Sequence, residues 1–283
     1  MGARRSSLFC PSENPEMMRK AVATDADVVN YDLEDSIALD AKDTARETLV
    51  RVLPEIDREG TEIAVRINPI VREGPTDVAA LSDADLDLDI LVVPKIELTT
   101  IDRLAELIAD AGLDVDVSVS IETATALRDV DRIAEADVVD AIGLGAEDLR
   151  TDVGMEPTDD ERELQYARGR IVVAGSAAGV RVSDTVYTDI DDLDGLAAVA
   201  KEARRMGFDG KSAIHPAQIP VINDAFTPDE ESIAWARRIV DAADETDAGV
   251  FQVDGEMIDE PVIQRARGIL QRARAAGVEP STE

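Results

Sequence analysis

Eight short runs rich in β-branched and other apolar residues recur along the chain, and helix-like stretches separate them. Alternating strand and helix segments are typical of βαβ units with parallel strands. Eight such units match a (β/α)₈ TIM barrel, in which the active site lies at the C-terminal ends of the strands. The predicted strands are residues 7–10, 28–33, 62–67, 90–94, 115–121, 138–144, 181–187 and 210–214.

The amphipathic stretches between these runs predict the crossover helices. They include residues 100–111, 125–134, 161–178 and 193–206. A doubly wound open sheet is the alternative, but no Gly-x-Gly-x-x-Gly motif follows an early strand, and Gly143-Leu144-Gly145 is too short to be that motif.

The barrel pattern is complete near Pro216, so we expect residues 1–222 to form the barrel and residues 223–283 a C-terminal extension. Two helices are predicted in the extension, at residues 227–243 and 260–275. The extension contains few large apolar residues, and we expect it to be an appendage without an independent core.

The charge of the chain is strongly acidic, with 61 Asp and Glu against 29 Lys and Arg and a net charge of −32. Only five residues are lysine. Acid excess with few lysines suggests adaptation to molar salt, where the screening length falls to roughly 3 Å; an ordinary acidic cytosolic protein is the alternative. Either way, nucleic acid and anionic membranes are poor partners.

The sequence also predicts a cytoplasmic protein. Cys10 is the only cysteine, which excludes an internal disulfide framework. No apolar run approaches the roughly 20 residues that span a bilayer, and no hydrophobic signal-peptide region follows the two arginines near the N-terminus.

Two strand-like runs end at carboxylates. Glu122 follows residues 117–121, and Asp148 comes shortly after residues 138–144. Two carboxylates with open coordination positions suit Mg²⁺, with Mn²⁺ as the alternative ion. Helix capping is the competing interpretation, although glutamate is not a preferred cap.

Three further charged residues end neighbouring strands. Glu34 and Asp35 follow the second strand, and we expect them to hold metal-bound water or outer groups, since one hydrated Mg²⁺ does not take four carboxylates. A solvated acidic loop is the alternative. Arg66 ends the third strand inside an apolar run and needs an anionic partner.

The order of these motifs resembles the citrate lyase β-subunit-like family, which includes malyl-CoA, β-methylmalyl-CoA and citramalyl-CoA lyases. The resemblance runs nearly end to end and includes Ile121-Glu122-Thr123-Ala124 and Gly143-Leu144-Gly145-Ala146-Glu147-Asp148. The other matching segments are residues 5–11, 31–36 with Lys42, Ala45 and Arg46, 65–68, 94–97, 207–211, 214–216 and 254–259.

The resemblance implies a role for each of several residues. It assigns Mg²⁺ to Glu122 and Asp148, and the carboxylate of an α-keto acid to Arg66, for which a salt bridge to Glu34 or Glu97 is the alternative. It suggests that Lys42 and Arg46 contact coenzyme A phosphates, with a plain surface helix face as the alternative. Phe9, Lys211 and His215 are the further substrate- or CoA-binding candidates, although an Ile-His-Pro segment is more often structural.

The resemblance also implies that the extension reaches a neighbouring subunit of a homotrimer or hexamer. There Asp259 serves as acid/base in the active site; capping of the last helix is the alternative or additional role. One departure concerns Ala174-Gly175-Ser176-Ala177-Ala178-Gly179, where relatives commonly carry an arginine. Because this arginine is absent, the sequence leaves open whether the acyl group is carried by coenzyme A or by another carrier.

The function implied is Mg²⁺-dependent, reversible cleavage of a 3-hydroxyacyl-CoA, L-malyl-CoA or β-methylmalyl-CoA, into glyoxylate and acetyl-CoA or propionyl-CoA. Alternatives are a thioester hydrolase, a citramalyl-CoA lyase, and a citrate lyase β subunit that acts on a carrier-protein thioester. A metal-dependent pyruvate aldolase fits less well, because the chain has no histidine before His215. A non-catalytic CoA-binding subunit is disfavoured by the presence of all four expected site residues, Glu122, Asp148, Arg66 and Asp259.

Overall fold

The computed structural model describes residues 2–278 except residues 59, 85 and 247. The chain divides into two compact units, one formed by Arg4–Asn223 and one formed by the residues from Asp224 on together with the few residues before Arg4. The division lies one residue from the boundary expected between residues 222 and 223.

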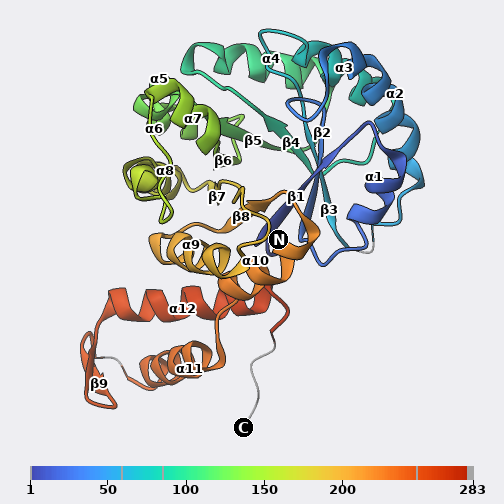
Figure 1. Cartoon of the computed structure of the whole chain (residues 1–283). Helices are drawn as coiled ribbons and strands as arrows, with labels where there is room; N and C mark the ends of the chain where they lie inside the picture. The colour runs from blue at the N-terminus through green and yellow to red at the C-terminus, as the bar shows by residue number, and fades with distance from the viewer. Residues whose placement is uncertain (1, 59, 85, 247, 279–283) are drawn as a thin grey trace. The chain divides into compact units, whose positions relative to one another are not determined.

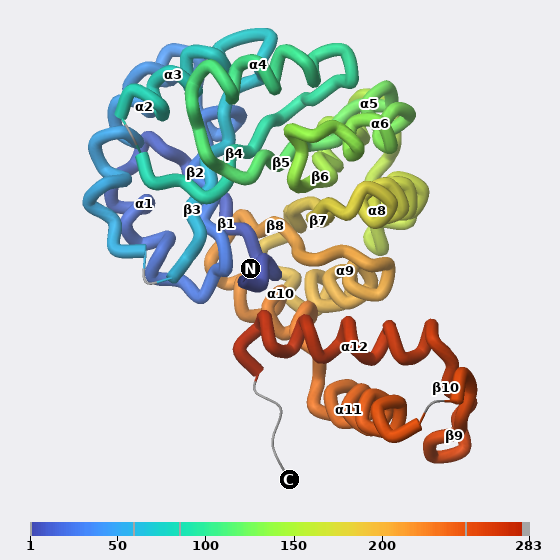
Figure 2. Tube along the Cα trace, turned by 180° about the vertical axis from the view of Figure 1, so that it is seen from behind, coloured from blue at the N-terminus to red at the C-terminus, as the bar shows by residue number. Residues whose placement is uncertain are grey.

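The first unit is a closed barrel of eight parallel strands that neighbour one another in chain order (Figures 1 and 2). Closure comes from β8 pairing with β1, where Ser6 lies opposite Lys211. The (β/α)₈ prediction is confirmed. The strands are β1 (Ser6–Pro11), β2 (Val28–Asp32), β3 (Glu62–Arg66), β4 (Ile90–Val93), β5 (Asp116–Ile121), β6 (Ala141–Leu144), β7 (Arg181–Asp184) and β8 (Gly210–Ala213).

Helices surround the barrel (Figure 1). They are α1 (Pro15–Ala21), α2 (Lys42–Val52), α3 (Gly74–Asp83), α4 (Ile101–Ala111), α5 (Ala124–Arg128), α6 (Val130–Ala134), α7 (Ala146–Val153), α8 (Gln165–Ala178), α9 (Leu193–Met206) and α10 (Ile219–Phe226). Short 3₁₀ turns lie at Leu39–Ala41, Leu53–Glu55, Leu98–Thr100, Arg162–Leu164 and Pro216–Gln218. Among the described residues, no helix is long and apolar enough to cross a membrane.

All eight predicted strands are present, and the differences are at their ends. β6 begins at Ala141 instead of residue 138, because Val139 closes a turn by donating its backbone N–H to the Ala136 carbonyl. The predicted helix at residues 125–134 is two short helices that meet at Asp129. The prediction for residues 193–206 matches α9.

The barrel interior contains both an apolar cluster and a set of small hydroxyl side chains. Buried Val28 at the start of β2, Ala64 in the middle of β3 and Ile90 at the start of β4 form an apolar cluster. Serines of β1, β5, β7 and β8 line the cavity of the barrel instead (Ser7, Ser118, Ser120, Ser183 and Ser212). These small hydroxyl side chains leave open space where a TIM barrel usually carries bulky branched residues.

The second unit consists of a helical hairpin and a short β-hairpin. Its elements are α11 (Glu230–Asp244), β9 (Phe251–Val253), β10 (Glu256–Ile258) and α12 (Glu260–Ala275), with β9 and β10 antiparallel. The expectation that this segment lacks its own core was wrong. Small residues let α11 and α12 approach closely around a hydrophobic cluster of Ile233, Ala236, Ile239, Ile258, Ile263, Ala266, Leu270 and Ala273.

Candidate active site

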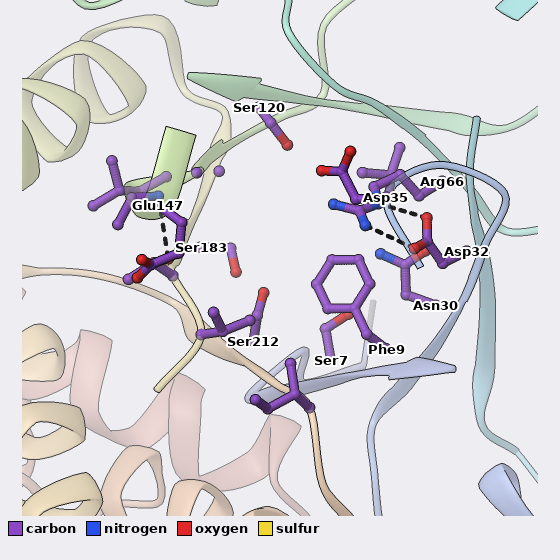
Figure 3. A pocket seen from close by; sticks show the side chains of 18 of the residues that line it. Ser7, Phe9, Asn30, Asp32, Asp35, Arg66, Ser120, Glu147, Ser183 and Ser212 are labelled. Atoms are coloured by element: carbon purple, nitrogen blue, oxygen red, sulfur yellow. Dashed lines mark hydrogen bonds and ion pairs between the residues drawn. The ribbon is translucent and has the colours of Figure 1, made fainter. Parts of the chain in front are cut away.

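A cavity of about 320 Å³ opens at the C-terminal ends of the barrel strands. Figure 3 shows side chains of β1, β2, β3, β5, β7 and β8 turned toward this space. Glu122, Asp148 and Arg66, which the sequence predicts as site residues, all line it. Phe9 and Asp35 line it as well, so the fold brings five of the predicted residues to one pocket.

Glu122 is held without a neutralising partner. It follows β5 and is 4% exposed, and its Oε2 atom has no hydrogen-bond partner among the described residues. Burial and, to a smaller extent, the nearby charges of Glu34 and Asp148 raise the pKa of Glu122 to about 8, although the charges of Lys95 and Arg66 oppose this shift. Burial of a carboxylate without a partner costs free energy. The Oε2 atom of Glu122 is therefore suited to bind a cation.

A glycine makes room for this carboxylate. A Cβ atom on Gly145, which caps α7, would lie 2.3 Å from Glu122 Cγ and 3.1 Å from Glu122 Oε1. The absence of a side chain at residue 145 therefore determines where the Glu122 side chain lies.

Asp148 reaches the pocket from the first turn of α7, where a helix favours negative charge. Its side chain is 46% exposed, and Lys95 Nζ lies 3.9 Å from its Oδ1 atom. Within the described part of the chain, no three histidine, cysteine or acidic side chains gather into a complete metal cage. Two oxygen ligands, one of them unpaired, fit a hydrated hard cation.

Arg66 is engaged by a residue that the sequence analysis missed. Its Nε and Nη2 atoms each donate to Asp32, at 2.7 Å, in a bidentate pair. Its Nη1 atom lies 3.3 Å from Glu34 Oε2, so the salt bridge to Glu34 considered above is present. The guanidinium also lies 4.7 Å from the centre of the Phe9 ring.

The other alternative for Arg66 is not formed, because Glu97 accepts a hydrogen bond from Thr123 instead. Burial opposes ionisation of Asp32, but the hydrogen bonds and charge of Arg66 hold the pKa of Asp32 below its ordinary value. The inward alternation along β2 places Asn30 and Asp32 on the pocket side, and this period-2 signal could have identified Asp32.

Lys95 is a second cation at the rim that the sequence analysis did not assign. Its Nζ atom donates to Glu34 Oε1 at 2.7 Å and to Asp35 at 3.4 Å. The backbone of Lys95 has a φ of 50°, in the left-handed region that residues other than glycine seldom adopt. Glu34 is thus buried between two cations, and Asp35 is exposed beside one of them.

Lys42 and Arg46 lie on α2 and do not line this pocket. The Lys42 amine is buried and donates to the carbonyls of Leu33, at 2.7 Å, and Glu34. Arg46 is buried as well and pairs with three acids: Asp43, Glu73 and Asp77. Neither side chain is a free surface cation, and the geometry gives both a structural role in supporting the β2 and β3 loops.

Lys211 is also committed to an internal partner. It is fully buried, and its Nζ atom donates to Asp184 at 2.7 Å. Asp184 in turn accepts two hydrogen bonds from Arg168, which also pairs with Glu161. This buried ionic network holds the ends of β7 and β8 together.

His215 caps the 3₁₀ turn that follows β8. Its Nδ1 atom accepts a hydrogen bond from the backbone N–H of Ala217 at 3.2 Å. The structural interpretation of the Ile-His-Pro segment agrees with this contact.

We expect Lys211→Met to lower the free energy of unfolding and to change the kinetic constants of the folded enzyme little. The change leaves a buried carboxylate with one cation fewer, which costs about 3 kcal/mol of unfolding free energy. Urea denaturation at constant salt measures this loss. A variant of wild-type stability with a strongly raised KM for the thioester would instead establish Lys211 as a substrate contact.

Asp259 lies in the second unit, immediately before α12. Its side chain accepts a hydrogen bond from the backbone N–H of Val262 at 3.4 Å, and Pro261 is in the first turn. The capping role is therefore present. The side chain is partly exposed, which leaves it accessible to a further partner.

The geometry is that of a barrel enzyme whose pocket carries acidic side chains able to bind a cation. Comparisons with known proteins identify the family. The family model described as HpcH/HpaI aldolase/citrate lyase matches residues 5–216. The citrate lyase subunit beta of Leuconostoc mesenteroides subsp. cremoris is 34% identical over 96% of this chain and 94% of its own length. The mitochondrial citramalyl-CoA lyase of Rattus norvegicus is 31% identical over 95% of this chain and 86% of its own length.

A solved structure supports the same family. The protein CitE of Mycobacterium tuberculosis, in complex with magnesium, acetoacetate and coenzyme A, is 36% identical and superposes with a TM-score of 0.81 over 96% of this chain and 98% of its own. The chain belongs to the HpcH/HpaI aldolase/citrate lyase family. It is a carbon–carbon lyase.

Proposed function

We propose that this protein is a Mg²⁺-dependent lyase that reversibly cleaves a 3-hydroxyacyl-CoA, L-malyl-CoA or β-methylmalyl-CoA, into glyoxylate and acetyl-CoA or propionyl-CoA. The observation that carries the proposal is the buried Glu122 carboxylate in the same pocket as Asp148 and Arg66, with an Oε2 atom that has no hydrogen-bond partner among the described residues. Relatives named as lyases and a neighbour that contains magnesium and coenzyme A support it.

Glu122 and Asp148 would hold the ion. When bound there, Mg²⁺ supplies positive charge to the oxygen that becomes the keto acid carbonyl. Burial and Gly145 position Glu122 for this task, and α7 positions Asp148.

Arg66 binds the carboxylate of the acid end. Asp32 takes one edge of its guanidinium, which leaves N–H groups of the two Nη atoms for a substrate oxygen. Asp32 and Phe9 keep the guanidinium plane in place. The serines of β5, β7 and β8 provide a polar wall beside the small acid.

Cleavage moves one proton from oxygen to carbon. The hydroxyl group gives its proton to water at the open rim, the bond between the hydroxyl carbon and the carbon next to the thioester breaks, and its electron pair enters the thioester to form an enolate. Asp259 of a neighbouring subunit then protonates the enolate carbon. In the reverse direction the same carboxylate takes a proton from acetyl-CoA or propionyl-CoA.

The assembly that this requires is a homotrimer or hexamer, in which the second unit of one chain reaches the barrel of another. Lys42, Arg46 and Lys211 are buried and ion-paired or bonded to carbonyls, so the phosphates of coenzyme A need other contacts. Residue 176, where relatives commonly carry the arginine, is an exposed serine on α8.

The experiment uses purified protein in about 2–3 M KCl, the salt level that screens the acidic surface. Glyoxylate is supplied with acetyl-CoA or propionyl-CoA and Mg²⁺, and products are followed by mass spectrometry. A malyl-CoA or β-methylmalyl-CoA adduct that disappears with EDTA is the expected result. Absence of any adduct with either thioester contradicts the proposed substrates.

Three other results would separate the related activities. Cleavage of citramalyl-CoA into pyruvate and acetyl-CoA would assign the activity for which the rat relative is named. Turnover of a carrier-protein thioester would assign a citrate lyase β role, for which the Leuconostoc relative is named. Free malate with released coenzyme A would indicate thioester hydrolysis.

Metal binding is expected to release a proton. Because the pKa of Glu122 is about 8 in the metal-free protein, the carboxyl group must ionise when the ion binds below that pH. The Kd for Mg²⁺ should therefore rise about tenfold for each unit that the pH falls below that value. Calorimetry at pH 7 in two buffers of different ionisation enthalpy measures the proton count; a pH-independent Kd with no proton release would contradict this assignment.

A further inference from the structure

The rim of the pocket carries more carboxylates than a hydrated Mg²⁺ ion binds as direct ligands. These carboxylates differ in their ion-pair partners. Asp32 is paired in bidentate fashion with Arg66. Glu34 lies between Arg66, at 3.3 Å, and Lys95, at 2.7 Å. Among the described residues, Glu34 and Glu122 each have a buried Oε2 atom without a hydrogen-bond partner, but only the Oε2 atom of Glu34 lies beside a guanidinium. Asp148 is 3.9 Å from Lys95. The two cations therefore pair most closely with Asp32, Glu34 and Asp35, whereas Asp148 lies at the outer limit of ion-pair distance from Lys95.

We propose that Lys95 is a positioning residue that determines the metal ligand set, by holding Glu34 and Asp35 in ion pairs and so leaving Glu122 and Asp148 as the two carboxylates that coordinate. The proposal deepens the metal-dependent function proposed above and rests on it.

The placement of Lys95 is specific. It follows β4 in a left-handed backbone conformation with a φ of 50°, which costs free energy for a residue with a Cβ atom. This conformation accompanies a side chain that contacts Glu34 and Asp35 and lies near Asp148. Strain of this kind at a pocket rim is frequently associated with function.

Without Lys95, the buried Glu34 carboxylate would retain, among the described residues, Arg66 as its one cationic neighbour, and Arg66 is already shared with Asp32. A divalent ion would then be the nearest available positive charge for Glu34. A third carboxylate favours Ca²⁺, which takes six to eight oxygen ligands, over Mg²⁺, which retains several water molecules. Loss of the lysine charge also removes a repulsion between it and the bound ion.

The test measures binding of Mg²⁺ and Ca²⁺ separately by calorimetry on the full-length chain at one fixed KCl concentration. For Lys95→Met we expect both ions to bind more tightly, Mg²⁺ by about tenfold and Ca²⁺ by more, so that the Ca²⁺/Mg²⁺ affinity ratio rises. Lys95→Arg keeps the charge and should restore the wild-type ratio. Lys201→Met removes an exposed lysine on α9 and is the control for net charge.

An unchanged or weakened affinity in Lys95→Met, with an unchanged ion ratio, would overturn the proposal. A raised KM for the thioester at unchanged metal affinity would overturn it as well and make Lys95 a substrate contact. Both results require that the wild-type protein binds Mg²⁺. A wild-type protein that binds no divalent ion would refute the proposed function itself, so the two failures are distinguishable.

Discussion

Replacement of Glu122 by glutamine is expected to abolish the lyase reaction. The amide keeps the size of the side chain but removes the negative charge that the ion needs, so kcat/KM should fall at least about a thousandfold, which corresponds to about 4 kcal/mol. The Kd for Mg²⁺ should rise by at least about a hundredfold. Continuous assay of thioester formation and calorimetry measure the two losses, and full activity in the variant would refute the metal assignment.

The same change should not harm the metal-free protein. In the unfolded chain Glu122 ionises near its ordinary pKa of 4.5, whereas in the folded chain burial delays ionisation to about 8. The raised pKa means that stability is lost as the pH rises from the lower value to the higher one. In EDTA at pH 8 or above, Glu122→Gln should therefore have a higher Tm than the wild-type protein.

The matched control is Glu147→Gln. Glu147 is next to Asp148 in the sequence and also lines the pocket, but its carboxylate is paired with Arg150. We expect Mg²⁺ affinity within about threefold of wild type, because surface ion pairs contribute little. Equal losses in the Glu122 and Glu147 variants would mean that general rim charge, and not a specific ligand, attracts the ion.

A second large loss of activity is expected from the single methyl group that alanine would add at residue 145. In Gly145→Ala the new Cβ would lie 2.3 Å from Glu122 Cγ, which is too close for the two atoms to coexist. The backbone of Gly145 has a φ of −95°, which alanine adopts without strain, so the effect is steric. Glu122 must move, and we expect kcat/KM to fall at least about a hundredfold, with an overpacking cost of about 1–3 kcal/mol.

Gly143→Ala provides the control for this prediction. Gly143 lines the same pocket, two residues earlier on β6, but its added Cβ would be 3.9 Å from its nearest neighbour, the carbonyl oxygen of Ser183. Kinetics of the two alanine variants should differ by more than an order of magnitude in kcat/KM. Similar kinetics in both would show that displacement of Glu122 is not the cause.

Much of the barrel could be predicted because its strands recur at regular intervals as short runs that are rich in β-branched and other apolar residues. β5 illustrates this: its alternation of valine and serine, ending at Ile121, predicts both the strand and the inward position of Glu122. The start of β6 and the break at Asp129 could not be predicted, since they depend on turn hydrogen bonds formed after the strands are in place.

The charged residues were harder to assign. Lys42, Arg46 and Lys211 occur in polar motifs that are typical of binding residues, yet each is buried against an acid or a carbonyl. Asp32 and Lys95 lie within recognised motifs, but the sequence does not reveal that they neutralise Arg66 and Glu34. These pairs join residues on different strands.

By itself, then, the sequence determined the strand number, the parallel alternation with helices, and the carboxylates that end β5 and begin α7, because these follow from local periodicity and strand ends. Only the tertiary structure decided which acids are neutralised and which remain free. That outcome depends on the order of strands around the closed barrel, where Arg66 meets Asp32 on the neighbouring strand and Lys95 reaches Glu34 across the rim. Charges distant in the sequence acquire partners only when closure places them within a few ångströms of one another.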